Sequence, residues 1–297
     1  MNPLDNARPE PAGREQLYAL LDRFMEALLA HDPSRLPWAP RVRNSENNVA
    51  LMIGDGLWNT ITGRGGYDLR FADPLTGQVG LFTTVIETRD ESACTIRLGT
   101  RDGAIAQVEI LVVRQADSGL KFENQRFERK PVLEEIVPPA ARVTRERMIA
   151  LADGYFSTLE MNDGRLFTHF HPDCNRVENG VQTTSNPDFF VEVARLGCEE
   201  QFRLGYYRYD DRLRGRRFPL VDEERGLVLA GGFIDHCGTL GDYVLTDGTR
   251  VSSPIRRPHS YYLLELFKLR DGAIRQIEAN FITVPYRMPS PWDSWAD

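Results

Sequence analysis

The feature that most constrains the fold of this chain is an internal repeat. Residues 15–36 read EQLYALLDRFMEALLAHDPSRL, and residues 146–166 read ERMIALADGYFSTLEMNDGRL. An offset of 131 residues places Phe24 against Tyr155, and the apolar positions 17, 20, 21, 24 and 28 recur as 148, 151, 152, 155 and 159. This spacing is typical of one face of an amphipathic helix. Each repeat is therefore expected to begin with a long helix.

Two further matches extend the repeat along the chain. Residues 45–48 (SENN) correspond to residues 177–180 (VENG), and RDGAIAQVE at 101–109 corresponds to RDGAIRQIE at 270–278. The offset grows from 131 to 169 residues, so the second copy contains 38 more residues than the first. We expect two domains, at 14–127 and 143–297, joined by a proline-containing linker at 128–142. Residues 1–13 are polar and are expected to form a disordered tail.

Strand signals follow the helix in both copies. Asp102-Gly103 and Asp271-Gly272 each separate two consecutive strand signals, which is the strongest short-range indication of a hairpin. The pattern predicts an α+β fold made of two tandem cone-shaped domains, each with helices packed on a strongly curved antiparallel sheet. The predicted strands are Tyr67–Ala72, Val79–Glu87, Ala93–Thr100, Ile105–Arg114, Leu227–His236, His259–Leu269 and Ile274–Thr283.

Composition and motifs exclude several classes of function. A net charge of −7 argues against a general nucleic-acid binder, which carries a basic surface. The sequence contains neither a signal-peptide pattern nor a run of 18 apolar residues, so the default is a cytoplasmic protein without a membrane partner. The four cysteines form no C-x-x-C pair and are expected to be free, mostly buried thiols. Phosphate-loop, dinucleotide and serine-hydrolase motifs are missing from the sequence.

Several longer motifs point to a known family. They are GDGLW (54–58), FADPLTGQVG (71–80), RRFPLVDEERGLVLAGGFIDH (216–236), FKLRDGAIRQIEA (267–279) and PYRMPSPW (285–292). The chain resembles the nuclear transport factor 2-like superfamily, which includes scytalone dehydratase, ketosteroid isomerase and SnoaL-like cyclases. It is most similar to a largely uncharacterised family of tandem domains of this type. The resemblance implies a conical cavity between helix and sheet, and association through the outer sheet face.

Comparison of the two copies favours the second cavity as the functional one. Tyr155 replaces Phe24, and Asn280 replaces Leu111 at the aligned position. Polarity in a core costs free energy unless it is partnered, so a purely structural core gains little from it. A tyrosine can also direct its hydroxyl to a partner at the rim, which leaves a structural alternative open. Four of the five histidines also lie in this copy, namely His169, His171, His236 and His259.

The candidate catalytic residues are those that can transfer a proton near neutral pH. His171 and Asp235 are the first choices, with Tyr155, His169 and His236 beside them. Asp235 and His236 are adjacent on a predicted strand, so only one of them is expected to face the cavity. A structural role for each single histidine remains the alternative. A metal site built from His169, His171 and a further histidine is a third possibility, because H-x-H can hold zinc.

The candidate binding residues come from three parts of the second copy and one part of the first. Arg176 stands where the first copy has Asn44, which favours a special role for it, whereas Glu178 corresponds to Glu46 and is expected to be structural. The basic run at 212–217 could bind an anion, although a solvated face is the usual explanation. The other candidates are Glu278 and Asn280 on one face of the last strand, His259, and the aromatic residues Phe233 and Trp58.

Together these features predict a cofactor-independent lyase or dehydratase that acts on a small hydroxylated aromatic compound. Superfamily relatives perform such eliminations without a cofactor, including cleavage of lignin-derived diaryl compounds. A binding or oligomerisation module and a metal-dependent enzyme are the alternatives, and a homo-oligomer is expected because curved sheets leave a broad face. An enzyme requires titratable groups that converge in one pocket. We expect at least two of Tyr155, His171, Asp235 and Asn280 to do so.

Overall fold

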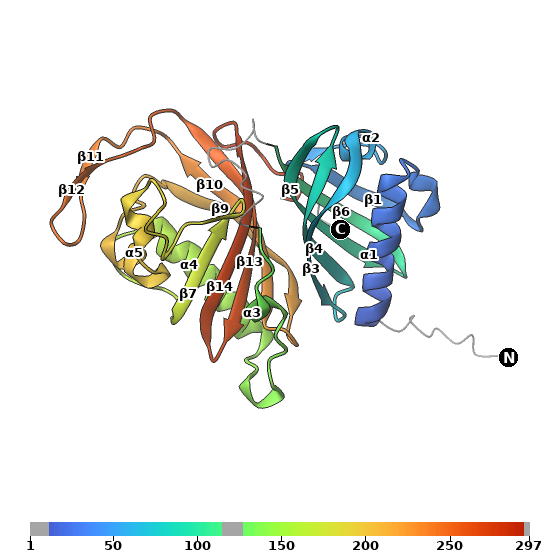
Figure 1. The fold of residues 1–297 in the computed structure, drawn as a ribbon, viewed down its shortest axis with the longest axis horizontal. Helices are drawn as coiled ribbons and strands as arrows, with labels where there is room; N and C mark the ends of the chain where they lie inside the picture. Colours follow the sequence, from blue (N-terminus) through green and yellow to red (C-terminus); the bar gives the residue numbers. More distant parts are fainter. Residues whose placement is uncertain (1–11, 115–126, 294–297) are drawn as a thin grey trace.

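The fold is known from a computed structural model that describes residues 12–114 and 127–293. Two similar halves follow one another along the chain, and each consists of helices packed on a six-stranded sheet (Figure 1). The predicted α+β class with two tandem domains is confirmed. Most of the tail predicted at residues 1–13 lies outside the described residues. No helix in the described ranges is long and apolar enough to cross a membrane.

The first half places its sheet strands in the order β2-β1-β6-β5-β4-β3. Helix α1 lies along one face of this sheet, and its apolar side is buried there together with the short helix α2. The elements are α1 (Arg14–Leu29), η1 (Pro33–Arg35), β1 (Trp38–Glu46), β2 (Val49–Ala50), α2 (Leu57–Thr60), β3 (Ile61–Asp73), β4 (Gln78–Glu87), β5 (Asp90–Arg101) and β6 (Ala104–Val113).

The second half repeats the same order, β8-β7-β14-β13-β10-β9, and adds elements that the first half lacks. Two short helices, α3 (Pro131–Glu134) and η3 (Pro139–Ala141), lie in the predicted linker. The remaining elements are α4 (Arg145–Met161), β7 (Phe170–Glu178), β8 (Val181–Gln182), η4 (Glu192–Arg195), α5 (Cys198–Leu204), β9 (Arg212–Asp222), β10 (Leu227–His236), β11 (Asp242–Val244), β12 (Arg250–Ser252), β13 (His259–Arg270) and β14 (Ala273–Val284).

The repeat is reproduced in atomic detail at Asn47 and Asn179. Both residues have a left-handed backbone with φ of 49°. The side chain of Asn47 accepts a hydrogen bond from the amide of Val112 at 2.8 Å, and that of Asn179 accepts one from the amide of Phe281 at 2.9 Å. Each asparagine thereby ties the end of the first long strand of its half to the last strand. The two predicted Asp-Gly hairpins are also present, with positive φ at both residues of each turn.

The sheets differ from the prediction in one respect. Each contains a parallel pair, because β1 lies parallel to β6 and β7 lies parallel to β14. The predicted antiparallel pairing does not extend to these two pairs. The remaining pairs between long strands are antiparallel, as expected. Each parallel pair joins the first long strand of a half to its last strand. The other long strands of that half lie between these two along the chain.

The faces of the sheets that α1 and α4 leave uncovered pack against each other in the middle of the molecule (Figure 1). One buried cluster combines apolar side chains of both halves, among them Phe71, Phe82, Leu229, Phe233 and Leu264. The expectation of a homo-oligomer assumed that these broad faces are exposed. That assumption is wrong for this chain, because the faces are buried within it.

The contact between the halves is reciprocal. Arg14 at the start of α1 forms an ion pair with Asp222 at 2.6 Å, and its equivalent Arg145 at the start of α4 forms one with Asp73. Asp73 ends β3 and Asp222 ends β9, so the same two positions meet twice with the halves exchanged. Each aspartate also accepts a backbone N–H from the other half at 3.1 Å. Such an exchange is the mark of an isologous, pseudo-two-fold interface.

Candidate functional site

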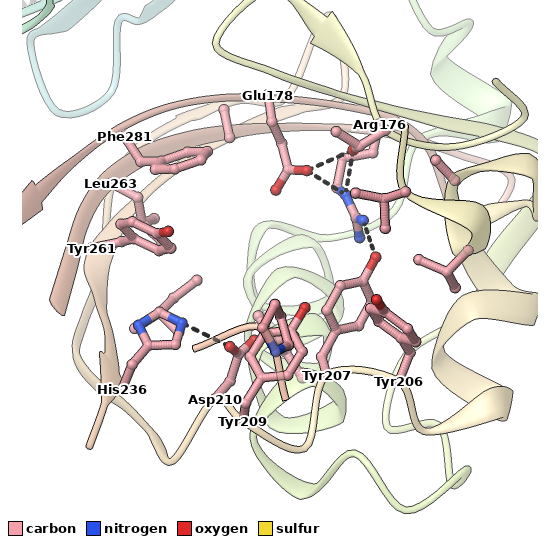
Figure 2. A pocket seen from close by; sticks show the side chains of 18 of the residues that line it. Arg176, Glu178, Tyr206, Tyr207, Tyr209, Asp210, His236, Tyr261, Leu263 and Phe281 are labelled. Atoms are coloured by element: carbon pink, nitrogen blue, oxygen red, sulfur yellow. Dashed lines mark hydrogen bonds and ion pairs between the residues drawn. The ribbon is translucent and has the colours of Figure 1, made fainter. Parts of the chain in front are cut away.

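The second half contains a cavity of about 290 Å³ between α4 and the concave face of its sheet (Figure 2). It reaches solvent beside Phe190, whose side chain lines the cavity while the residue is 85% exposed. Most of the wall is apolar, and the aromatic side chains in it are Tyr155, Phe189, Phe190, Tyr206, Tyr207, Tyr209, Tyr261 and Phe281.

The extra residues of the second copy build much of this wall. Residues 183–211, between β8 and β9, contain η4 and α5, whereas the corresponding segment of the first half contains only α2. The strands β10 and β13 are separated by residues 237–258, whereas a two-residue turn joins β4 and β5. Both insertions contribute to the lining, the first with Tyr207 and Asp210 and the second with Ile255. The insertions therefore form a wall that has no counterpart in the first half.

The concave face of the first half is instead filled with apolar side chains. Phe24, the equivalent of Tyr155, is fully buried and meets Trp58 edge-on with 5.5 Å between ring centroids. The strand registers identify two further pairs of equivalent positions that are apolar in the first half and polar in the second. These pairs are Leu51 and Thr183, and Ile96 and Glu265.

Arg176 lies at the centre of a buried polar network on one wall of the cavity (Figure 2). Its Nη2 donates to the hydroxyl of Tyr207 at 2.6 Å and to Oε1 of Gln201 at 2.8 Å. Its Nε donates to Thr183 at 3.1 Å and lies 3.2 Å from the Glu178 carboxylate. Burial alone would lower the pKa of Arg176, but the charge of Glu178 and the nearby hydroxyls raise it well above its usual value. The guanidinium is therefore charged and almost fully satisfied by the protein.

A histidine–aspartate pair occupies the opposite wall. Nε2 of His236 lies 2.8 Å from Oδ1 of Asp210, and both side chains are almost completely buried. Burial raises the pKa of Asp210, and the hydrogen bond with His236 offsets part of that effect. The imidazole is stacked on His259, with 4.6 Å between ring centroids. Its Nδ1 has no hydrogen-bond partner among the described residues.

Glu265 projects from β13 on the face that lines the cavity. Burial raises its pKa to about 8, and the nearby Glu178 carboxylate acts in the same direction. The charge of Arg176 and a hydrogen bond with Tyr155 oppose this shift without cancelling it. At neutral pH Glu265 therefore carries a proton and can donate a hydrogen bond, as a carboxyl group held in an apolar site can.

Three predicted residues lie in the cavity wall, namely Tyr155, His236 and Arg176. His169 and His171 do not. His169 precedes the strand β7, and His171 is the second residue of that strand. His169 is exposed, and Nδ1 of His171 accepts a hydrogen bond from the amide of Asp173 at 3.1 Å. Neither histidine lines the cavity in which a catalytic role was expected for it.

Asp235 faces away from the cavity, as the alternation with His236 requires. Its carboxylate accepts Nε of Arg214 at 2.8 Å and the hydroxyl of Ser260 at 2.5 Å. Phe233 lies on the same side, within the cluster that joins the two halves, and the Arg214 guanidinium is stacked 4.0 Å above its ring centroid. Both residues therefore stabilise the interface side of the sheet and do not line the pocket.

The face of β14 that holds Glu278 and Asn280 is directed at the first half. Tyr67 donates to Glu278 at 2.6 Å, and Lys130 lies 3.1 Å from the same carboxylate. Asn280 donates to Oγ1 of Thr95 at 2.8 Å. Both residues therefore lie at the interface between the two halves and do not line the cavity, so their predicted place in a binding site there is wrong.

The last two predicted binding residues lie at the rim and in the other half. His259 stacks on His236 and contacts solvent, and burial lowers its pKa. Trp58 is buried in the core of the first half and does not reach the cavity. Of the four side chains expected to converge, only Tyr155 lines the cavity. The described residues contain no group of three or more histidine, cysteine, aspartate or glutamate side chains that could hold a metal ion, so the histidines do not gather as the metal hypothesis required.

Sequence reasoning missed several residues of the site. Gln201, Tyr207 and Asp210 lie in the first insertion, where no aligned residue of the first copy marks them. Glu265 carried a detectable signal, because it is an acidic residue on a strand face whose other members are Tyr261, Leu263 and Phe267. An acidic residue in such a row indicates either a buried partner or a functional group.

Comparisons with known proteins add little to this geometry. A family model described as "Domain of unknown function (DUF8021)" matches residues 141–281, which is most of the second half. No curated protein matches the chain. A de novo designed protein with a curved β-sheet is 14% identical with a TM-score of 0.28, over 34% of this chain and 88% of its own. AclR from Streptomyces galilaeus, which carries the provisional name of a hydroxylase, is 15% identical with a TM-score of 0.28, over 46% of this chain and 90% of its own. Neither likeness is close enough to support a conclusion.

Proposed function

We propose that the protein is a cofactor-independent lyase or dehydratase, built from two nuclear transport factor 2-like domains, whose active site is the cavity of the second half. The observation that carries this proposal is the presence of a histidine–aspartate pair and a buried carboxyl group, whose pKa burial raises, in one largely apolar cavity. Acid–base elimination requires a base and an acid that are held in one site and have different proton affinities.

His236 is the proposed base. Its Nε2–H is directed at Asp210, so the neutral ring carries its lone pair on Nδ1. The Asp210 carboxylate would hold this tautomer and stabilise the imidazolium that forms when Nδ1 accepts a proton. Nδ1 has no hydrogen-bond partner among the described residues and is buried, so the ring or its neighbours must move to expose it to a substrate.

Glu265 is the proposed acid. In the elimination His236 removes a proton from the substrate, the bond to the leaving group breaks, and Glu265 gives its proton to the departing oxygen. Tyr155 would stabilise negative charge that develops on the substrate, and Arg176 would support it through the hydrogen bond that it donates to the Tyr155 hydroxyl at 3.5 Å. Reprotonation of Glu265 and deprotonation of His236 by solvent would restore the starting state.

The wall suggests the kind of substrate. A volume of about 290 Å³ suits a compound of one or two rings. Rings stack and meet edge-on with aromatic neighbours, and here Tyr261 and Phe281 form such a surface with 4.7 Å between their centroids. These features favour a small aromatic compound with a hydroxyl group.

The test is a conversion assay with a panel of hydroxylated aromatic compounds, read by mass spectrometry for loss of water or formaldehyde. The variant His236→Gln is expected to lower kcat by about 100-fold or more, since it removes the base. His171→Gln removes a histidine outside the cavity and is expected to leave kcat unchanged. Equal activity of wild type and His236→Gln would refute the assignment of the base.

The largely apolar wall also fits the second candidate, a carrier of small molecules. A carrier would bind the same compounds and return them unchanged. Two results together would favour the carrier. Wild type would bind compounds of the panel tightly without converting them, and the variants His236→Gln and Glu265→Gln would bind them as tightly as wild type.

A further inference from the structure

Glu178 lines the cavity and uses only one of its two carboxylate oxygens to bind the protein. Oε2 accepts a hydrogen bond from the hydroxyl of Thr183 at 2.5 Å and lies 3.2 Å from Nε of Arg176. Oε1 has no hydrogen-bond partner in the described part of the chain, and it is not enclosed by protein, because the side chain is 25% exposed. Figure 2 shows one oxygen directed at Arg176 and the other turned toward the open space of the cavity.

The equivalent residue of the first half, Glu46, uses both of its oxygens. Its Oε2 accepts the amide of Leu57 at 2.6 Å, and its Oε1 accepts Nη2 of Arg114 at 3.0 Å. The repeat places Thr283 where the first half has Arg114, so the cation that binds this oxygen is replaced by a short neutral side chain. The oxygen that the protein binds in the packed half is thus left for a ligand in the half that contains the cavity.

The neighbours of this carboxylate determine which kind of group Oε1 can bind. Nε of Arg176 donates to Oγ1 of Thr183 at 3.1 Å, and the Thr183 hydroxyl donates in turn to Oε2 of Glu178. A carboxylate oxygen is only an acceptor, so a ligand group that meets Oε1 has to donate a hydrogen bond. An uncharged donor is sufficient, because the guanidinium of Arg176 already balances the charge of Glu178.

We propose that Oε1 of Glu178 accepts the hydroxyl group of the aromatic substrate, and that Glu178 thereby selects ligands that donate a hydrogen bond over ligands that only accept one. This inference rests on the proposed function for its choice of site, and it adds the residue that positions the substrate. The rings of Tyr207 and Tyr261 lie around the same open space and would contact the ring of the bound molecule (Figure 2).

Two matched probes test the selection by calorimetry at pH 7, namely 2-naphthol and 2-methoxynaphthalene. Both have the same ring system, but only the naphthol can donate a hydrogen bond. A site that hydrogen-bonds a hydroxyl group discriminates against the analogue without it, so wild type is expected to bind the naphthol at least about 10-fold more tightly.

The variant Glu178→Gln keeps the shape of the side chain and changes the group that faces the cavity. Arg176 and Thr183 both donate at the position of Oε2, so the amide oxygen is expected there and the amide N–H groups face the ligand. The oxygen of either probe can accept from these groups, and the two affinities should therefore come within about 3-fold of each other. Selection that arose only from the bulk of the methyl group would persist in this variant.

The matched control is Glu199→Gln, which makes the same change at an exposed residue of α5 outside the cavity lining. It should keep the preference of wild type. Thermal unfolding checks that both variants are folded.

Three results would each overturn the proposal: wild type binds both probes equally, wild type binds neither, or Glu178→Gln keeps the preference of wild type. Failure of the proposed enzyme gives a different result, in which the preference and its loss in Glu178→Gln are both observed but no hydroxylated aromatic compound is converted. If compounds are converted while Glu178→Gln retains the preference of wild type, the enzyme stands and the role of Glu178 is refuted.

Discussion

Glu265 illustrates how one side chain changes the character of a core. The equivalent position of the first half holds Ile96, which is fully buried in an apolar cluster. A carboxyl group in such surroundings keeps its proton, and burial holds the pKa of Glu265 at about 8, well above its usual value of 4.5. The folded and unfolded chains therefore bind this proton with different affinities, and the free energy of unfolding must depend on pH.

This predicts a specific pH dependence. Because the pKa of Glu265 is raised in the fold, its contribution to stability is complete below about 4.5 and is lost as pH rises through about 8. Between pH 5 and pH 8 the wild type should lose roughly 3–4 kcal/mol of unfolding free energy more than Glu265→Gln. Denaturant unfolding of both proteins at the two pH values measures the difference. Parallel pH profiles would contradict the prediction.

The residues of the site were predictable only where the repeat offered a comparison. Tyr155 and Arg176 stand out because an aligned residue of the first copy has a different chemistry. His236 was one of several histidines, and nothing in the sequence separated it from His171. The difference arises from the strand on which each lies, since β10 turns His236 into the cavity and β7 leaves His171 at an edge.

At the scale of elements, α5 is the part of the insertion that holds the cavity wall in place. Its Gln201 is fully buried and uses all of its hydrogen-bonding groups. The amide nitrogen donates to the carbonyls of Thr183, Val193 and Leu196, and the oxygen accepts from Arg176. A short helix of this kind has little stability of its own and depends on such tertiary contacts.

Truncation of this side chain should be costly. Gln201→Ala removes the donor to the Thr183 carbonyl and the acceptor for Arg176 and Tyr207, and we expect the free energy of unfolding to fall by about 2–3 kcal/mol. Glu199→Ala on the same helix removes only an exposed pair with Arg203 and should cost no more than about 1 kcal/mol. Chemical denaturation of wild type, Gln201→Ala and Glu199→Ala measures the two losses of unfolding free energy. A loss for Gln201→Ala as small as that of the control would show that the amide does not hold the wall.

The elements that could be predicted are those with strong local signals. Helices α1 and α4 and the hairpin strands follow from apolar periodicity and from the Asp-Gly turns. β9 was not predicted, because its run of arginines at 212–217 looks like a solvated surface. In the structure Arg214, Arg216 and Arg217 each have an acidic partner from another element, so the charges are compatible with a strand in the sheet. Such long-range pairing is not visible in a local pattern.

At the scale of the whole molecule, the two ion pairs that connect the halves should contribute similarly. Asp73 and Asp222 are both buried, and each holds an arginine and a backbone N–H of the other half. Removing one partner from a buried pair is strongly destabilising, because the remaining charge is left uncompensated. The pseudo-symmetry of the contact implies that the two positions are interchangeable in their effect.

We therefore expect Asp73→Asn and Asp222→Asn each to lower the free energy of unfolding by about 3 kcal/mol, with values within about 1 kcal/mol of each other. The control Asp68→Asn removes partly exposed pairs with Arg64 and Arg70 and should cost about 1 kcal/mol at most. Thermal and denaturant unfolding provide the comparison. A large effect at one position and none at the other would refute the functional equivalence of the two contacts.

The sequence predicted that two domains exist but not how they pack. Glu109 and Glu278 are aligned by the repeat, yet their partners differ. Burial raises the pKa of Glu278, whereas the guanidinium groups of Arg97 and Arg217 lower the pKa of Glu109 to about 2 despite its burial. Aligned residues of a pseudo-symmetric interface can thus acquire different surroundings, and a comparison of the copies alone does not reveal them.

The reciprocal contact has a consequence for how such a molecule can evolve. In a dimer of identical subunits every substitution appears twice, so a change that opens a cavity weakens both partners at once. Here the two partners are encoded separately and joined by a short linker, which holds them at an effective concentration on the order of millimolar. The half that contains Ile96 can keep a dense core while the half that contains Glu265 gives up packing for chemistry. Because both halves belong to one chain, one half can remain a tightly packed scaffold while the other half acquires a cavity, and the two halves still stay together.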